Sequence, residues 1–504
     1  MVAHIPSLVY VGMKTSPLRD INRIIQVLMA ICLLSYSPYV GAQETAPNVI
    51  IMIADDVSWD DIGCYGNSQV KTPNIDALAA EGLMFTNAYL TTSSCSPSRN
   101  SIMTGRYPHN TGAAELHTEP PIDFQAFPEL LRKEGYFSLQ AGKFHMGAYA
   151  EGAFDVIYRK REETGDGGEK LWLKGLQERP KDKPFFMWFA AYDAHRVWGP
   201  NEFSGTHSPD SLKPPFYLAE GKETRKDLAQ YYDEIHRFDH YVGEVAEELK
   251  RQEVFEQTLI IIMADNGRPF PHSKTRVNDR GLKTPFIISW PERITQKGQS
   301  CEALVSAIDI APTILALADV EIPENIQGVS FEHVLNSPEK AFRTHVFGEH
   351  NWHDYEAHER MVRNDRYMYI LNSRPNAPQM GPADAVQSPS HKELNQLRAK
   401  GELSPIQADI FMVPRPREEL YDLETDPQQL VNVASVPSYE VALEEMRNIL
   451  GEWMEETGDD VPAFLTEDWY LHEAGYIRTA AHGKRGEMPG ASRQATEINA
   501  KGKF

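Results

Sequence analysis

A cysteine and two arginines stand close together in the segment 95–106. Cys95 precedes Pro97 by two residues. The segment that follows is compatible with a helix and carries Arg99 and Arg106. Because proline fixes its own φ and restrains the residue before it, a helix is expected to begin near Pro97. The unpaired N–H groups of a helix N-terminus favour anions, so this segment is suited to hold an anionic substrate. A buried loop cysteine beside an ordinary helix start is the alternative.

Two apolar segments end in side chains that carry oxygen ligands. Residues 48–54 and 258–264 are continuous apolar runs, typical of central strands in a parallel sheet, whose carboxyl ends bind ligands. The residues that follow are Asp55 and Asp56 in the first case, and Asp265 and Asn266 in the second. Adjacent carboxylates repel unless a cation lies beside them, and this donor set suits Ca²⁺ or Mg²⁺ better than zinc. Either motif alone could also be a simple turn.

Basic side chains and histidines follow at further expected strand ends. Lys143 and His145 come after the apolar segment 136–141, and His195 follows the segment 184–192. A lysine binds an oxyanion as a point charge, and a histidine transfers protons near neutral pH. Each of them also has a plainer interpretation, as a solvated lysine or a hydrogen-bonded histidine. The remaining candidates for an anion pocket are Arg196 and Lys274.

In their order along residues 47–290, these motifs resemble those of the type I sulfatases, members of the alkaline-phosphatase-like superfamily. The resemblance rests on C-x-P-S-R followed by T-G-R, on D-D and D-N-G after strands, and on G-K-x-H. It implies that Cys95 is oxidised to formylglycine (3-oxoalanine), whose hydrated aldehyde supplies the nucleophile. It also implies that one Ca²⁺ ion lies among Asp55, Asp56, Cys95, Asp265 and Asn266.

The resemblance further implies a role for each polar residue. Ca²⁺ and Arg99 would favour ionisation of the hydrate, while Lys143 and Lys274 hold the sulfate oxygens. His195 would protonate the departing sugar oxygen or nitrogen, and His145 would remove the second hydrate proton so that sulfate is released. Further substrate contacts are expected from Arg196, His350 and His353.

The segments 93–99 and 265–271 are most similar to the sulfamidase (heparan N-sulfatase) branch of the family. Animal members of that branch have arginine where Lys274 stands, so the N-sulfate specificity need not carry over. The expected substrate is a sulfated polysaccharide or oligosaccharide, either algal, such as ulvan or carrageenan, or a glycosaminoglycan. The alternatives are a sulfamidase, a phosphonate or phosphate monoester hydrolase of the same superfamily, and a non-catalytic glycan-binding protein with unmodified Cys95.

Length and composition bound the architecture. With 504 residues and 41% hydrophobic content, the chain can bury a large core, and its net charge of −22 disfavours nucleic-acid or anionic-membrane binding. The resemblance implies an α/β fold, with a large, mostly parallel mixed sheet sandwiched by helices over residues 43–340. A smaller α+β subdomain of antiparallel sheet and helix is expected at 341–470, with a strand at 362–371 and a helix at 439–454. The polar segment 471–504 is expected to be a mobile tail.

The first 42 residues have the pattern of an export signal. Positive residues precede an apolar stretch at 24–34 and small residues at 40–42. We expect cleavage after Ala42 and a periplasmic or secreted protein without stable membrane insertion, an uncleaved anchor being the alternative. The resemblance implies a maturation partner, a formylglycine-generating or anaerobic sulfatase-maturing enzyme. Cys64 and Cys301 could pair or stay reduced.

Overall fold

The computed structural model describes Met1, Gly12 and residues 46–469 and 484–504. The chain divides into two compact units, Met1–Thr45 and Ala46–Phe504, and the description below concerns the second. The expected export signal lies outside the described residues, apart from Met1 and Gly12. Within the described part of the chain, no helix is long and apolar enough to cross a membrane.

An eight-stranded mixed sheet with the order β5-β4-β6-β1-β7-β8-β2-β9 forms the centre of the fold. Its strands are β1 (Asn48–Ala54), β2 (Leu83–Phe85), β4 (Phe137–Gly142), β5 (Val156–Tyr158), β6 (Phe185–Ala190), β7 (Thr258–Ala264), β8 (Phe286–Ser289) and β9 (Gln299–Cys301). The neighbours from β5 to β7 pair in parallel, whereas β8 is antiparallel to β7 and β2. A separate pair joins β3 (Ala88–Tyr89) to β10 (Val305–Ser306). The predicted large, mostly parallel mixed sheet is confirmed.

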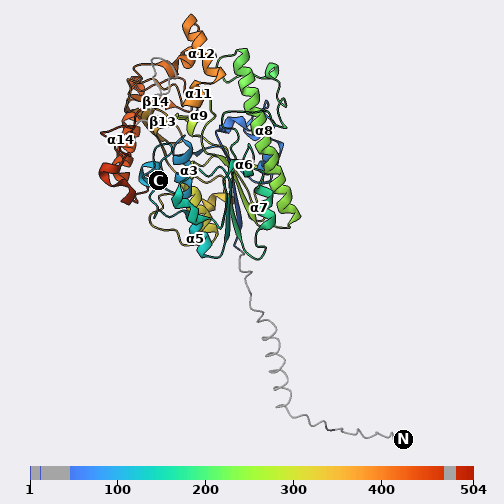
Figure 1. The fold of residues 1–504 in the computed structure, drawn as a ribbon. Helices are drawn as coiled ribbons and strands as arrows, with labels where there is room; N and C mark the ends of the chain where they lie inside the picture. The colour runs from blue at the N-terminus through green and yellow to red at the C-terminus, as the bar shows by residue number, and fades with distance from the viewer. Residues whose placement is uncertain (2–11, 13–45, 470–483) are drawn as a thin grey trace. The chain divides into compact units, whose positions relative to one another are not determined.

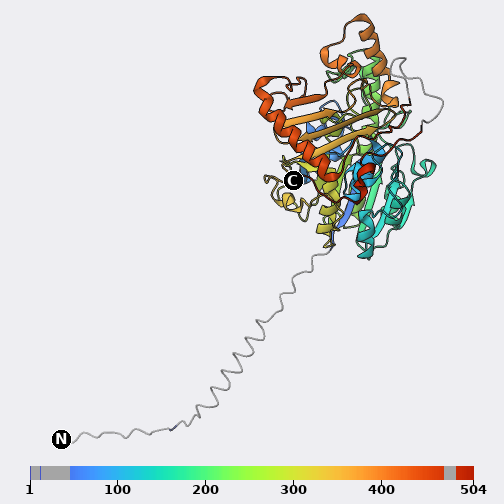
Figure 2. The same cartoon turned by 90° about the vertical axis from the view of Figure 1, so that its left-hand side faces the viewer.

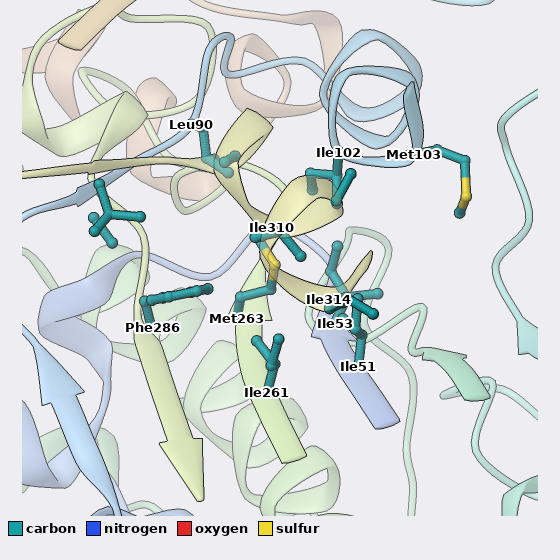
Figure 3. Close-up of a cluster of buried hydrophobic side chains, with 14 of the residues drawn as sticks. Ile51, Ile53, Leu90, Ile102, Met103, Ile261, Met263, Phe286, Ile310 and Ile314 are labelled. Carbon is teal, nitrogen blue, oxygen red and sulfur yellow. The ribbon is translucent and has the colours of Figure 1, made fainter. Parts of the chain in front are cut away.

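Helices cover both faces of this sheet (Figure 1). One face packs against α3 (Cys95–Thr104), α5 (Phe127–Lys133) and α10 (Ile310–Leu317), and the other against α2 (Pro73–Glu81), α7 (Trp172–Glu178) and α8 (Lys222–Arg251). Successive side chains of β1 point to opposite faces of the sheet. Ile51 and Ile53 pack with Ile102 and Ile310 on one face (Figure 3). Ile50 packs on the face that α8 covers. A strand buried on both faces must be apolar throughout, which explains the continuous run in the sequence.

A four-stranded antiparallel sheet forms the smaller subdomain, as predicted. It consists of β11 (Val346–Trp352), β12 (Glu356–Arg363), β13 (Tyr367–Asn372) and β14 (Glu418–Asp422), covered by α14 (Glu440–Thr457) (Figure 2). Trp453 of α14 stacks on Phe347 with ring centroids 4.9 Å apart. The remaining α-helices are α4 (Pro108–Thr111), α6 (Arg161–Thr164), α9 (Asp279–Leu282), α11 (Ala383–Val386), α12 (Pro389–Lys400) and α13 (Pro405–Ala408).

Two local expectations differ from the structure. The segment 362–371 is not one strand, because Asn364 Oδ1 accepts hydrogen bonds from the backbone N–H groups of Arg366 and Tyr367 and turns the chain between β12 and β13. Helix α3 begins at Cys95, earlier than expected, since Ser98 N–H already bonds to the carbonyl of residue 94. Proline is tolerated in this first turn because amides there have no partner within the helix.

The C-terminal segment 484–504 packs against the main body, so the expectation of a mobile tail is wrong for these residues. Arg106, buried in the structure, donates to the carbonyls of Thr496 and Ile498 and to Asn499 Oδ1 at 2.8–3.1 Å. The second arginine of the 95–106 segment therefore holds the end of the chain rather than an anionic substrate. Burial lowers the pKa of Arg106 to about 10.

Substituting Arg106 with alanine should loosen this segment and lower the free energy of unfolding by roughly 2–4 kcal/mol, because several buried acceptors lose their donor. Urea denaturation measures the loss, and limited proteolysis followed by mass spectrometry shows whether cleavage now occurs within 484–504. Arg493→Ala is the control, since the exposed Arg493 forms a surface ion pair with the exposed Glu455 at 2.7 Å. Equal stability of the two variants would contradict the role assigned to Arg106.

Candidate active site

The predicted metal ligands meet at the carboxyl edge of the central sheet. β1 and β7 are adjacent and parallel, with Ala54 opposite Ala264, so residues that follow the two strands lie side by side. These residues are Asp55, Asp56, Asp265 and Asn266. The Asp56 backbone N–H donates to Asp265 Oδ1 at 3.2 Å, and Asp56 itself has a left-handed φ of 63°. Strand pairing thus brings together two motifs that lie far apart in the sequence.

Cys95, the first residue of α3, points into this group of oxygen atoms. Its Sγ lies 3.8 Å from Asp55 Oδ1 and 4.0 Å from Asp56 Oδ1. The ligand atoms of Asp55, Cys95 and Asp265 lie within 4.8 Å of one another. Burial raises the pKa of Cys95 to about 12, so an unmodified thiol here is protonated and a poor nucleophile.

Three cations balance the three buried carboxylates. Arg99 Nε donates to Asp265 Oδ2 at 2.7 Å, and Nη2 lies 2.7 Å from the same oxygen. Lys143 Nζ donates to Asp55 Oδ2. The remaining pair joins Lys274 Nζ to Asp56 Oδ2 at 2.7 Å. Arg99, Lys143 and Lys274, three of the predicted anion-binding side chains, therefore lie in one group.

The electrostatic balance differs between the two adjacent aspartates. Burial opposes ionisation of Asp55, but neighbouring charges, Lys143 foremost, hold its pKa below the usual value. Burial raises the pKa of Asp56 well above the usual value, and the Asp55 carboxylate adds to this rise against the opposing charge of Lys274. A divalent cation among the carboxylates would stabilise the ionised form of both.

The donor set fits a hard divalent cation. Asn266 Oδ1 is buried and, within the described part of the chain, has no hydrogen-bond partner, while Asn266 Nδ2 lies 3.5 Å from Cys95 Sγ. A half-turn of this amide would direct Oδ1 toward the carboxylates. One amide oxygen with three carboxylates is the oxygen-rich ligation that Ca²⁺ and Mg²⁺ prefer.

Gly142 allows the chain to turn Lys143 into the site. Its φ is +99°, and a Cβ at this position would lie 1.9 Å from the carbonyl oxygen of Ala190. The same carbonyl accepts a hydrogen bond from Lys143 N–H at 2.8 Å, which extends the pairing of β4 with β6 by one residue. A side chain at position 142 would therefore displace the lysine.

His145 is held by a second histidine that no sequence pattern marked. His117 Nδ1 lies 2.8 Å from His145 Nε2, and the backbone N–H of His117 donates to Ser96 Oγ at 2.8 Å. Both histidines line a cavity of about 300 Å³, together with Glu119, Glu151 and Arg159. Burial, with the charge of Lys143, lowers the pKa of His145 well below its usual value, so its neutral imidazole can accept a proton.

His195 lies on another side of the site, beside a carboxylate that the sequence did not indicate. His195 Nε2 is 3.9 Å from both Asp56 Oδ2 and Asp384 Oδ2. Asp384, on α11, also lies 3.2 Å from Lys274 Nζ. Burial and the charge of Lys274 lower the pKa of His195 to about 4, and an anionic substrate would oppose the lysine charge and raise it.

The three other predicted substrate contacts have different surroundings. His353 Nδ1 lies 2.8 Å from Ser94 Oγ, next to Cys95. The guanidinium of Arg196 donates to both carboxylate oxygens of Asp227, at 2.7 and 2.8 Å, and is thereby committed within the protein. His350 is fully buried in β11, with its ring against Tyr355. The structure thus brings His353 to the site, but it does not bring Arg196 or His350 into the catalytic group.

Aromatic side chains from the C-terminal part of the chain pack on the apolar side of Cys95. Trp352 and Trp469 pack in one cluster with Cys95 and Leu116, and their rings meet edge to face with centroids 4.9 Å apart. The ring of Trp469 also stacks against that of His117, with the ring centroids 6.2 Å apart. No local pattern in the sequence indicated that a residue so far along the chain would reach Cys95.

Two family models match the chain. The model described as sulfatase matches residues 47–320, and the model described as N-sulphoglucosamine sulphohydrolase, C-terminal, matches residues 272–409. The chain belongs to the sulfatase family. A human N-sulphoglucosamine sulphohydrolase is 31% identical over 476 residues, which cover 84% of this chain and 93% of that protein. An ulvan-active sulfatase of Formosa agariphila is 29% identical over 467 residues, which cover 82% of this chain and 76% of that protein.

Solved structures agree on the fold. A structure described as a complex with its substrate D-glucosamine-2-N,6-O-disulfate aligns with a TM-score of 0.63 at 21% identity, covering 81% of this chain and 98% of that one. The phosphonate monoester hydrolase of Agrobacterium radiobacter aligns with a TM-score of 0.62 at 19% identity, and the alignment covers 86% of this chain and 100% of that one. Family membership makes this sulfatase a sulfuric ester hydrolase, as the motifs predicted. Its Cys64 and Cys301 are both unpaired.

The contact between His117 and His145 predicts a selective effect on turnover. His117→Phe keeps a ring against Trp469 but removes the hydrogen bond, so kcat should fall about 10- to 100-fold while KM changes little, because His145 is no longer oriented. His117→Asn places an amide near the position of Nδ1 and should retain most of the activity. Steady-state kinetics on an aryl sulfate measures both variants, and equal losses in the two would contradict an orienting role.

Proposed function

We propose that this sulfatase removes sulfate groups from a sulfated polysaccharide or oligosaccharide, with formylglycine at position 95 and one Ca²⁺ ion. The observation that carries the proposal is the placement of Cys95 at the start of α3, within 4.8 Å of the Asp55 and Asp265 oxygens. Arg99 on Asp265 and the lysines on Asp55 and Asp56 surround the same point with positive charge. This arrangement suits an anionic group bound next to a modified cysteine.

Asp55, Asp56, Asp265 and Asn266 would hold the Ca²⁺ ion. When bound, Ca²⁺ supplies positive charge at the sulfate oxygens and at residue 95, where a hydrated aldehyde supplies hydroxyl groups in place of the thiol. A cation held by these carboxylates would compete with the ammonium groups that contact them. Lys143 and Lys274 would then be able to contact the sulfate oxygens and stabilise the charge that develops during transfer.

Two histidines carry the proton transfers. His195, 36% of whose side chain is exposed, is placed to donate a proton to the departing sugar atom. His145, neutral and hydrogen-bonded through Nε2, is placed to accept a proton near residue 95. The two imidazoles therefore serve different steps and have different neighbours: His117 Nδ1 lies 2.8 Å from His145 Nε2, and Asp56 Oδ2 lies 3.9 Å from His195 Nε2.

The relatives support a sulfated carbohydrate as substrate. One is described as active on ulvan, another as acting on N-sulphoglucosamine, and a structural neighbour contains a sulfated glucosamine. A sulfamidase is the second candidate, favoured by the match of residues 272–409 to the N-sulphoglucosamine sulphohydrolase C-terminal model. Sulfate release from matched O-sulfated and N-sulfated saccharides separates the two functions.

We also propose export and maturation of the chain. Residues 1–42 would act as a signal peptide cleaved after Ala42, which gives a periplasmic or secreted enzyme. A formylglycine-generating or anaerobic sulfatase-maturing enzyme would convert Cys95. Because the net charge of −22 repels anions, an anionic substrate would need the local group of basic side chains to overcome that repulsion.

Cys95→Ala should abolish sulfate release from the saccharide, whereas Cys64→Ser should leave it unchanged, because Cys64 lies beside Asp76, away from the site. Sulfate release is measured by ion chromatography. In parallel, mass spectrometry of the peptide that carries residue 95 should show the thiol replaced by an aldehyde in the active enzyme. Sulfate release that persists in Cys95→Ala would refute the proposed nucleophile.

Adding Ca²⁺ to the chelator-treated enzyme should stabilise it by about 2.7 kcal/mol when the free ion is at about 100 times its Kd, because only the folded state holds the ligands together. Thermal unfolding with and without Ca²⁺ measures the effect. Asp265→Asn should remove most of this stabilisation, and Asp155→Asn, which alters a partly exposed pair with Arg132, should preserve it. A stabilisation that is equal in both variants would contradict the proposed ligands.

A further inference from the structure

One carboxylate in the catalytic group has no role in the chemistry described so far. Asp384 lies on the short helix α11, in the part of the chain that follows the central sheet. Its Oδ2 atom is 3.2 Å from Lys274 Nζ and 3.9 Å from His195 Nε2. It therefore stands beside one residue that binds sulfate and one that protonates the leaving atom.

The backbone holds this carboxylate in a defined orientation. Asp384 Oδ1 accepts a hydrogen bond from the backbone N–H of Ala385 at 2.7 Å, and the N–H of Ala383 donates to Asp354 Oδ2 at 2.8 Å. The Ala385 N–H fixes Oδ1 of Asp384, and the contact of Ala383 with Asp354 fixes the start of α11. The other oxygen, Oδ2, therefore faces Lys274 and His195. The orientation does not depend on the lysine alone.

Exposure distinguishes Asp384 from the metal-binding carboxylates. Its side chain is 18% exposed, compared with 1% for Asp55 and 0% for Asp56 and Asp265. His195, its neighbour, is 36% exposed. Asp384 and His195 thus form the open side of the group, where a substrate would enter and where the sugar would remain after the sulfate is bound.

A negative charge at the entrance to an anion pocket needs an explanation. Lys274 already pairs with Asp56 at 2.7 Å, so Asp384 is not required to neutralise it. Burial opposes ionisation of Asp384, but Lys274 holds its pKa below the usual value, and the group is a carboxylate at neutral pH. A fixed carboxylate repels sulfate groups and accepts hydrogen bonds from hydroxyl groups.

We propose that Asp384 determines specificity by accepting a hydrogen bond from an unsubstituted hydroxyl group on the sugar carbon next to the scissile sulfate, and by repelling a second sulfate there. Because His195 Nε2, the proposed proton donor to the leaving atom, is 3.9 Å from Asp384 Oδ2, a substituent on the adjacent carbon can reach this carboxylate. The preferred substrate is therefore a saccharide with an isolated sulfate rather than a vicinal disulfate. This assignment rests on the proposed function.

Two variants separate the hydrogen bond from the charge. Asp384→Ala removes both, so kcat/KM for a saccharide with a free neighbouring hydroxyl should fall about 10- to 100-fold, as when a polar substrate group loses its partner. Asp384→Asn keeps an acceptor of the same shape and should lose less, while its activity on the vicinal disulfate rises relative to that of the native enzyme. With 4-nitrophenyl sulfate, which offers no neighbouring donor, both variants should stay within about 3-fold of the native enzyme.

Glu418→Gln is the matched control, because it removes one carboxylate charge in the smaller subdomain, where Glu418 pairs with Arg447. Its activity on all three substrates should match that of the native enzyme. Equal losses of Asp384→Ala on the saccharide and on the aryl sulfate would overturn the assignment, as would no loss on either. Aryl sulfate turnover within range also shows that the variant is folded.

The same measurements separate failure of this assignment from failure of the proposed function. If the native enzyme releases sulfate from the saccharides and the Asp384 variants behave like it, the assignment alone is wrong. If the native enzyme releases sulfate from the aryl ester but from no saccharide, the proposed polysaccharide function is wrong and the assignment falls with it.

Discussion

The balance of charge among three buried carboxylates governs the whole site. Asp55, Asp56 and Asp265 lie at the ends of two paired strands, where water cannot solvate them. Carboxylates buried this closely require opposite charge. The protein provides Arg99 and two lysines, and the same oxygens fit a divalent cation. A divalent cation and these three basic side chains would therefore compete for the same oxygens.

The placement of Cys95 follows from the same constraint. Cys95 begins α3, whose buried face packs on the central sheet through Ile102 and Met103. Because α3 is fixed against the sheet, its first turn is held against the carboxyl ends of β1 and β7. The positive end of the helix then adds to the charge of Arg99 near residue 95. Packing of the core thus positions the reacting residue.

The second half of the chain completes the site rather than forming an independent module. Asp384 reaches Lys274, His353 reaches Ser94, and Trp469 packs in the cluster that contains Cys95. The candidate metal ligands, by contrast, follow strands of the central sheet. The C-terminal part therefore contributes neighbours to the candidate site, whereas the central sheet carries its buried carboxylates.

Most of the central machinery could be predicted because it lies at the ends of strongly patterned strands. A buried strand must be apolar on both faces, so its end is visible in the sequence, and the polar residues that follow it are natural candidates. The positions of β1, β4, β6 and β7 followed from this rule, and so did Lys143 and His195. The turn at Asn364 was missed because a single side-chain hydrogen bond interrupts an otherwise continuous alternation.

The amino-acid sequence by itself indicated the buried strands and the polar residues that follow them, because both are visible in local spacing, and the resemblance of its motifs indicated the sulfatase family. Only the tertiary structure decided the neighbours of the catalytic residues. His117 meets His145, and Asp384 meets Lys274 from 110 residues away, through contacts that no local periodicity records. Arg106 was likewise assigned to the end of the chain only by packing. Such contacts depend on how whole elements dock, which local spacing does not specify.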